Sequence, residues 1–216
     1  TLTRTGIGED LASTGDLDIT DNLMILGSGS AQTTIDGNDI DRVFHARGGV
    51  QVELSGITVR GGQADGPGGG IWQEFGTLTV SESLFTDNTT NNTGGAIATN
   101  QAVVSITDSS LTNNVATGDG GALSLSGTTT IENAVFSGNQ ADDGGAIYTI
   151  SNTLTISNST LNSNTAGNRG GAVLSQQNTT TRITNTTLDG NTASAGGAFY
   201  KQNSGLAEFV GSTFSA

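Results

Sequence analysis

The chain has 216 residues, with 33 glycines, one proline and no cysteine, and its 20 acidic and 7 basic residues give a net charge of −13. Charge of this sign repels phosphate backbones and anionic lipid headgroups, so we expect neither nucleic acid nor a membrane surface as a partner. The lack of cysteine excludes disulfides and thiolate metal sites. No run of 18 apolar residues is present, so direct membrane insertion of this segment is not expected.

The first third of the chain predicts an irregular entry into a strand-rich fold. Residues 1–16 show no regular apolar spacing, and we expect a lead-in there. Between residues 17 and 67, short alternating segments such as Leu17-Asp18-Ile19 and Val50-Gln51-Val52 predict strands. They follow the later repeat only loosely, which predicts irregular first coils.

From residue 68 to residue 216 the sequence is a repeat. A glycine pair, usually followed by a small residue, precedes an apolar residue that recurs every 24 or 26 residues, at Ile71, Ile97, Leu123, Ile147, Val173 and Phe199. A second apolar column runs through Val80, Ile106, Ile131, Ile156, Ile183 and Phe209, and each member is followed five residues later by Phe or Leu. Asparagine stands three residues further on, at Asn88, Asn114, Asn139, Asn164 and Asn191.

A unit of about 25 residues cannot bury its own apolar face, so its copies must stack to form a core. Stacking short strands in register produces parallel sheets, and three apolar positions per unit predict three strands and three corners. We therefore expect an all-β, single-stranded parallel β-helix of seven to eight coils, one segment over residues 1–216 of a longer protein. The stacked asparagines either form a hydrogen-bonded ladder or cap their own turns.

Two motifs connect the chain with known proteins. Gly-Gly-Ala-Ile at residues 144–147, together with Phe85-Thr86-Asp87-Asn88 and Phe136-Ser137-Gly138-Asn139, resembles the repeats of chlamydial polymorphic outer-membrane proteins. The opening, with Asp-Leu-Asp-Ile-Thr at residues 16–20, resembles bacterial β-helix proteins that carry an N-terminal CSLREA segment. The resemblance implies a right-handed β-helix in a bacterial cell-surface or secreted protein, where it is a structural or adhesive segment, or part of an extracellular filament.

An outward column of side chains is the predicted contact surface. The residue after each inward apolar residue should point outward, which selects Trp72, Ala98, Ser124, Tyr148, Leu174 and Tyr200. The only tryptophan and both tyrosines of the chain are in this column. On a flat sheet, Trp72, Tyr148 and Tyr200 could bind a surface glycan or a neighbouring protein subunit. The alternative is that strands simply favour aromatic residues.

Catalytic residues are not predicted, and we expect a protein that is not an enzyme. Asp142-Asp143 is the only adjacent acidic pair within the repeats of residues 68–216 and is typical of a solvated turn, and His45, the only histidine, is expected at the surface or a corner. The alternative is a polysaccharide-modifying enzyme, similar to a lyase or epimerase, with its site near Asp142, Asp143 and Arg169.

No cofactor is predicted, and the remaining hypotheses concern calcium and assembly. Asp16, Asp18 and Asp21 could offer oxygens to calcium where the first coils stack, with an ordinary acidic surface as the alternative. The open end of a solenoid exposes unpaired strand edges, so end-to-end self-association is also expected. An outward column of hydroxyl side chains that includes Thr79 and Thr155 resembles an ice-binding surface. Arg182 interrupts this column, which argues against ice binding.

Overall fold

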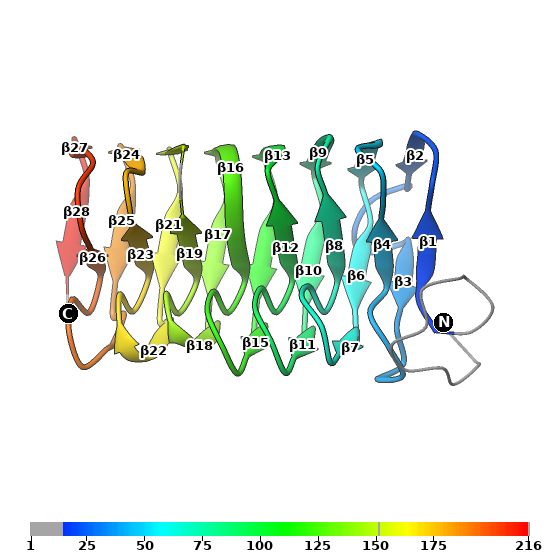
Figure 1. Cartoon of the computed structure of the whole chain (residues 1–216), viewed down its shortest axis with the longest axis horizontal. Coiled ribbons are helices and arrows are strands. Elements are labelled where there is room, and N and C mark those ends of the chain that lie inside the picture. Colours follow the sequence, from blue (N-terminus) through cyan, green and yellow to red (C-terminus); the bar gives the residue numbers. More distant parts are fainter. Residues whose placement is uncertain (1–14, 151, 216) are drawn as a thin grey trace.

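The computed structural model describes residues 15–150 and 152–215. These residues form a right-handed parallel β-helix of about 8 turns with about 26 residues per turn and no helix. The coils stack into a straight rod, with the first and last described coils at opposite ends (Figure 1). In the described ranges no helix is long and apolar enough to cross a membrane.

Each regular coil passes through four strand positions, here named A to D. Position A is occupied by β1 (Leu17–Ile19), β4 (Phe44–Ala46), β8 (Ile71–Glu74), β12 (Ile97–Asn100), the first part of β16 (Leu123–Glu132), β19 (Ile147–Ile150), β23 (Val173–Gln176) and β26 (Phe199–Lys201). Position B is occupied by β2 (Leu23–Leu26), β5 (Gln51–Ser55), β9 (Thr77–Ser81), β13 (Ala102–Thr107), the rest of β16, β20 (Thr153–Ser157), β24 (Thr180–Thr184) and β27 (Ala207–Val210).

The other two positions complete each coil. Position C is occupied by β3 (Thr34–Asp36), β6 (Thr58–Arg60), β10 (Leu84–Thr86), β14 (Ser110–Thr112), β17 (Val135–Ser137), β21 (Thr160–Asn162), β25 (Thr187–Asp189) and β28 (Thr213–Ser215). Position D is occupied by β7 (Gln63–Ala64), β11 (Thr89–Thr90), β15 (Val115–Ala116), β18 (Gln140–Asp143) and β22 (Thr165–Arg169).

The expectation of three strands per coil is wrong by one strand. Positions A and B form one 15-stranded sheet because β16 runs through the corner between them, whereas C is an 8-stranded sheet and D a 5-stranded one. The strands at D are short, and only one of their residues faces the core in β7, β11 and β15. Their inward residue is small, Ala64, Thr90 or Ala116, and a column with a single small residue per coil was not recognised among the larger apolar columns.

The apolar columns stack as predicted. Ile106, Ile131 and Ile156 are direct partners in neighbouring strands, and each is fully buried. Burying an aliphatic side chain of this size stabilises the fold by roughly 1.5–3 kcal/mol. Repetition of that contribution along the rod allows short strands without disulfides to form a stable core.

The asparagines form a continuous ladder inside the core. The Nδ2 atom of each asparagine donates to Oδ1 of the asparagine one coil further on, at 2.9–3.1 Å. Its second hydrogen is donated to a backbone carbonyl of the preceding coil. The left-handed turn residue is the one before it, such as Asp87 or Asn113, with φ of 55° in both. The ladder alternative is therefore confirmed.

A hydroxyl ladder at the next corner was not recognised in the sequence. Each hydroxyl donates to the carbonyl two residues earlier and accepts an amide hydrogen bond from the preceding coil. Its members are Ser83, Ser109, Ser159, Thr186 and Ser212. Serine and threonine are so common in this chain that the column does not stand out from its background.

Candidate functional site: a groove between sheets A and D

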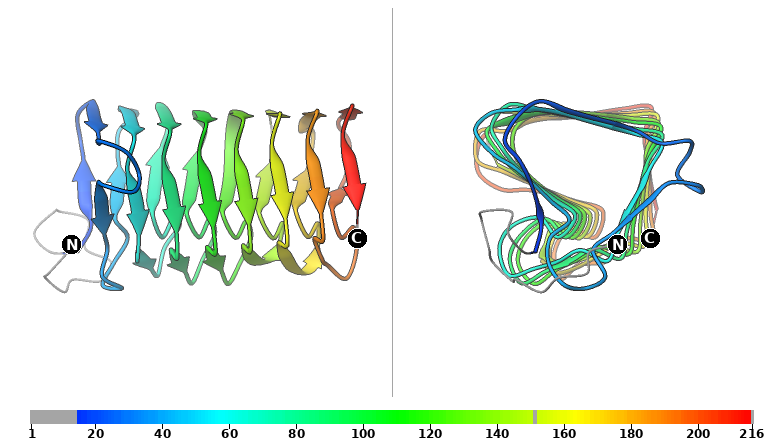
Figure 2. Two further views of the ribbon diagram at one scale, coloured as in Figure 1. Left: turned by 180° about the vertical axis from the view of Figure 1, so that it is seen from behind. Right: turned by 90° about the vertical axis from the view of Figure 1, so that its right-hand side faces the viewer.

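The glycine pairs bend the coil inward on one side. Viewed down the rod, the outline of the coil is indented between the lobe formed by the D strands and the A strands (Figure 2). The first glycine of a pair has positive φ, for example 72° at Gly120. The second packs against the next coil: a Cβ on Gly121 would lie 2.2 Å from the Gly145 carbonyl oxygen. Only glycine permits both features, so the repeat motif produces the indentation.

The predicted outward column lines this indentation, which we name the inner groove. Register pairing confirms the column from Trp72 through Ala98, Ser124, Tyr148 and Leu174 to Tyr200 and extends it backward to His45 and Asp18. The expectation of a flat exposed sheet is wrong, because Ala98 and Leu174 are buried in the bend. The facing wall of the inner groove is a column of turn residues, Asp119, Asp143, Arg169 and Ala195, which pair in register.

Two hollows lie along the inner groove and share Pro67 and Trp72. The middle hollow measures about 350 Å³ and is bounded by Trp72 and Tyr148 on the floor side and Asp119 on the wall. Trp72 and Tyr148 are three coils apart, roughly 14 Å at the usual strand spacing. The two residues between them in the column, Ala98 and Ser124, are small, and this size difference makes the depression.

Asp119 is the titratable group of the middle hollow. Burial, together with the nearby carboxylates of Asp143 and Asp142, raises the pKa of Asp119 to about 6. The Tyr148 hydroxyl hydrogen bonds to Asp119, and burial beside this acid raises the pKa of Tyr148 to about 12. Near neutral pH the hollow therefore contains a neutral phenol hydrogen-bonded to a carboxyl group that exchanges its proton readily.

Arg169 crosses the inner groove beyond the middle hollow. Its guanidinium forms an ion pair with Asp143 through Nη2 and through Nε at 3.1 Å. Nη1 donates to Oε1 of Gln202 on the opposite side at 2.6 Å, and the guanidinium carbon lies 5.9 Å from the centre of the Tyr200 ring. Tyr200 is therefore in contact with Arg169, and of the predicted aromatic residues only Trp72 and Tyr148 share the middle hollow.

The N-terminal hollow measures about 290 Å³ and contains residues that the sequence did not single out, above all Glu74 and Arg42. Arg42 is buried and binds Asp16 through Nε and Nη2, each at 2.8 Å. His45, expected at the surface, is only 4% exposed. It lies between Glu74, with Nε2 to Oε1 at 2.9 Å, and Asp18, with Nδ1 to Oδ1 at 3.5 Å. His45 is buried because it pairs in register with Asp18 in the preceding coil and with Trp72 in the next. This burial follows from the stacking of the coils and is not visible in the sequence.

Two of the three aspartates predicted for calcium, Asp16 and Asp18, lie beside basic side chains. Asp16 is directed at Arg42, and Asp18 lies near His45 and Arg47, whereas Asp21 is exposed. Within residues 15–150 and 152–215, no three His, Asp or Glu side chains are grouped so that they could hold a metal ion. Burial raises the pKa of Asp16, although Arg42 opposes that shift. A basic partner beside each buried carboxylate is typical of ion pairing.

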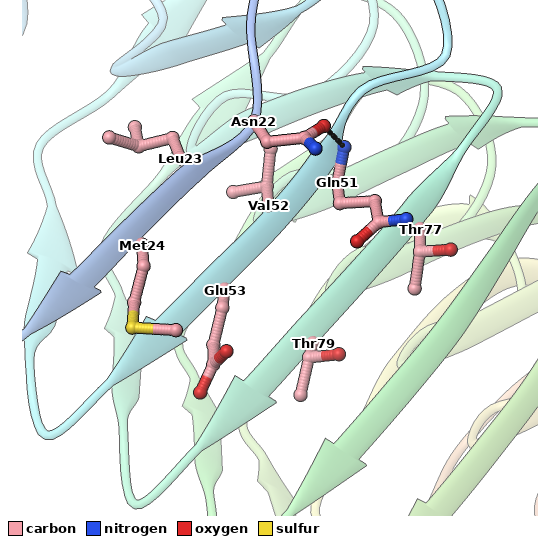
Figure 3. A pocket seen from close by; sticks show the side chains of 8 residues that line it. All are labelled: Asn22, Leu23, Met24, Gln51, Val52, Glu53, Thr77 and Thr79. Carbon is pink, nitrogen blue, oxygen red and sulfur yellow. Dashed lines mark hydrogen bonds between the residues drawn. The ribbon is translucent and has the colours of Figure 1, made fainter.

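A third hollow, of about 210 Å³, lies outside the inner groove on the outer face of position B (Figure 3). Its sides are formed by Met24, Glu53 and Thr79, which stand in one column, and the Asn22 side chain accepts a hydrogen bond from the Gln51 amide at 2.9 Å. The same column continues to Arg182, which forms an ion pair with Glu208 at 2.8 Å. This face lacks the aromatic residues and the facing wall of the inner groove.

Fold and groove together define the class of protein: a right-handed parallel β-helix with a concave groove along one side. The family described as right handed beta helix region matches residues 23–214. The chain therefore belongs to this family. The match extends to β-helix proteins in general and does not single out the chlamydial or CSLREA-linked proteins. No curated protein and no solved structure was found to match the chain.

Proposed function

We propose that the protein is a non-enzymatic structural or adhesive segment of a bacterial cell-surface or secreted protein, and that its inner groove binds an extended glycan. The observation that carries this proposal is the middle hollow, in which Trp72 and Tyr148 lie in one column opposite Asp119. Aromatic rings stack on the apolar faces of sugars, while hydroxyl, amide and carboxyl groups bind sugar hydroxyls. The location at the bacterial surface rests on the resemblance of the repeats alone.

The shape of the groove supports a linear ligand. Coils follow one another at roughly 4.8 Å, so a chain lying along the rod meets a new pair of wall and floor residues at each coil. Asn100, Ser124 and Ser126 supply neutral hydrogen-bonding groups along this path. Arg169, which spans the groove, limits the length available beyond Tyr148.

A glycan array tests the proposal. The wild-type protein is compared with a triple variant, Trp72→Ala, Tyr148→Ala and Tyr200→Ala, and with Phe75→Ala as the control, because Phe75 is 44% exposed and lies outside the hollows of the inner groove. Circular dichroism shows whether each variant is folded. We expect loss of binding in the triple variant alone. Undiminished binding by the folded triple variant would rule the inner groove out.

Polysaccharide modification is the second candidate, and the acid in the middle hollow favours it. Asp119 has a pKa near 6 and lies next to Asp143, which Arg169 holds by an ion pair. A carboxylic acid beside an ionised carboxylate is the arrangement used for acid-assisted cleavage of glycosidic bonds. Because Arg169 is engaged by Asp143 and Gln202, it is poorly placed to abstract a proton as in a lyase.

The exposed Asp108, which lines neither hollow of the inner groove, provides a control. The wild-type protein, Asp119→Asn and Asp108→Asn are incubated with the polysaccharides that the array identifies, and new reducing ends and unsaturated products are measured. Release of product that is abolished only by Asp119→Asn supports an enzyme. Binding without product from any of the three proteins supports the binding function.

The proposed filament would form by end-to-end association of copies of this chain. The last coil exposes apolar side chains, including Phe209 at 41% and Val210 at 46%, and the first exposes Leu26 at 66%. The Phe209 ring already packs edge-on against Phe199 and Phe214, with centres 5.0 Å apart. If a second copy continues the register, Phe209 meets its Ile25 and Val210 meets its Leu26.

Sedimentation velocity tests this contact. We expect the wild-type protein to associate as its concentration rises, and Leu26→Asp to prevent association by placing a charge opposite Val210. Val103→Asp is the control, since Val103 is 54% exposed on the same sheet but lies in the middle of the rod. A wild-type protein that stays monomeric at every concentration contradicts the proposal.

A further inference from the structure

The N-terminal hollow is acidic on the side of Trp72. Among the described residues, Asp65 and Glu74 line it beside Trp72. Arg42 also lines it, but its Nε and Nη2 bind Asp16 and its Nη1 donates to the Pro67 carbonyl oxygen at 2.9 Å. All three guanidinium nitrogens are therefore engaged within the protein.

His45 orients Glu74 without removing its charge from the hollow. The His45 ring donates from Nε2 to Oε1 of Glu74, and the Glu74 side chain remains 30% exposed. Oε2 of Glu74 has no protein partner among the contacts of the described residues. An aromatic ring beside a partly exposed carboxylate is an environment that attracts a cation, through the ring face and through charge.

We infer that the N-terminal hollow binds the protonated amine of an amino sugar within the glycan, so that the inner groove selects glycans with free amines. This inference rests on the proposed glycan-binding function and names its ligand class. Trp72 connects the two hollows, so a glycan stacked on this ring in the middle hollow extends toward Glu74.

The same charge balance excludes acidic glycans. Arg42 is engaged by Asp16 and Arg169 by Asp143, so neither is available for a sugar carboxylate. Among the described residues that line the N-terminal hollow, a uronate would face Asp65 and Glu74, and the one arginine, Arg42, is already bound to Asp16. Burying such a carboxylate next to like charges is unfavourable.

The experiment is calorimetric titration with two matched probes, the β-1,4-linked hexamer of glucosamine and the same hexamer fully N-acetylated. They have the same length and linkage and differ at the nitrogen, which is a charged amine in one and a neutral acetamide in the other. We expect the glucosamine hexamer to bind about tenfold more tightly, a difference of about 1.4 kcal/mol, and the preference to decline as salt is added. Glu74→Gln, whose amide oxygen can still accept from His45, should remove the preference.

Glu53→Gln is the matched control, because Glu53 lies on the outer face of position B (Figure 3). Should Glu74→Gln fail to fold, Asp65→Asn replaces it, since Asp65 is exposed and its substitution disturbs only a contact with Asn91. The preference should survive in Glu53→Gln and decrease in Asp65→Asn.

The outcomes separate this inference from the proposed function. Equal affinity for both hexamers, unchanged by Glu74→Gln, overturns the amine site and leaves glycan binding intact. Binding of neither hexamer by a protein that binds other glycans on the array also overturns it. Binding of a lysine-rich peptide but of no glycan overturns both, because the cation would then come from a protein. If the wild-type protein binds no glycan on the array, the proposed function itself is contradicted.

Discussion

The asparagine ladder is predicted to be a principal source of stability, and Asn139→Ala tests it. Asn139 is 1% exposed and lies in the middle of the ladder. Its Nδ2 donates to Asn164 Oδ1 and to the Leu111 carbonyl oxygen, each at 2.9 Å. Its Oδ1 accepts from Asn114 twice, from the amide at 3.0 Å and from Nδ2 at 3.1 Å.

Alanine at position 139 removes all four of these hydrogen bonds. A net contribution of about 1 kcal/mol for each gives a loss of about 4 kcal/mol. The Asn114 amide is left buried without its acceptor, and a single orphaned group of this kind costs about 1–3 kcal/mol. This cost is part of the same loss and not an addition to it, so a loss of about 4 kcal/mol is expected, which is a large share of the stability of a typical domain.

The assay is urea denaturation followed by circular dichroism, combined with amide hydrogen exchange at Asn114. Hydrogen exchange is needed because long repeat arrays can unfold in parts. Asn168→Ala is the control, since Asn168 is exposed and makes one side-chain bond, to Asp142 at 3.0 Å. We expect this control to change stability by less than about 0.5 kcal/mol.

Two results would refute the reasoning. One is a loss in Asn139→Ala below about 1 kcal/mol, comparable with that of Asn168→Ala. The other is unchanged protection of the Asn114 amide, because that amide has its acceptor on Asn139. Either result would show that packing, and not the ladder, stabilises this corner.

Two other predictions concern the bend and the acid in the groove. Gly145→Ala places a Cβ 2.2 Å from the Gly171 carbonyl oxygen and should lower the free energy of unfolding, measured by denaturant titration, by about 3 kcal/mol. The control Gly167→Ala, at an exposed position, should leave stability nearly unchanged. Equal effects of the two substitutions would contradict the close-packed turn. The pKa of Asp119 is raised from 3.8 to about 6, so the stability that it contributes is present below pH 3.8 and is lost as pH rises through about 6. Asp119→Asn should therefore raise Tm near pH 8 and have little effect at pH 3.8, and the opposite pattern contradicts the assigned shift.

The sequence predicts the fold well because every coil of a β-helix repeats the same buried apolar positions and turn residues. Ile106, Ile131 and Ile156 occupy one column, and their spacing alone places them above one another. The glycine pairs and the asparagines mark two further columns. The D strands were missed because a two-residue strand such as β11 (Thr89–Thr90) has one inward residue, and its column consists of alanine and threonine and not of a large apolar residue.

The candidate site was predicted only in part. The alternation of inward and outward side chains along a strand predicted that Trp72 and Tyr148 stand in one outward column, and the structure confirms this column. The facing wall could not be predicted, because the curvature of the coil brings Asp119 opposite the floor column. His45 was misplaced for the same reason: its partners Asp18 and Glu74 are 27 and 29 residues away and meet it only through stacking.

Trp72 makes one measurement especially direct, because it is the only tryptophan in the chain and lines both hollows of the inner groove. Its fluorescence emission can be followed while a glycan identified on the array is titrated, with acrylamide quenching measured at each step. If the inner groove is the contact surface, emission shifts to shorter wavelength and quenching decreases in parallel with binding. Saturating binding that leaves both emission and quenching of Trp72 unchanged would contradict this account.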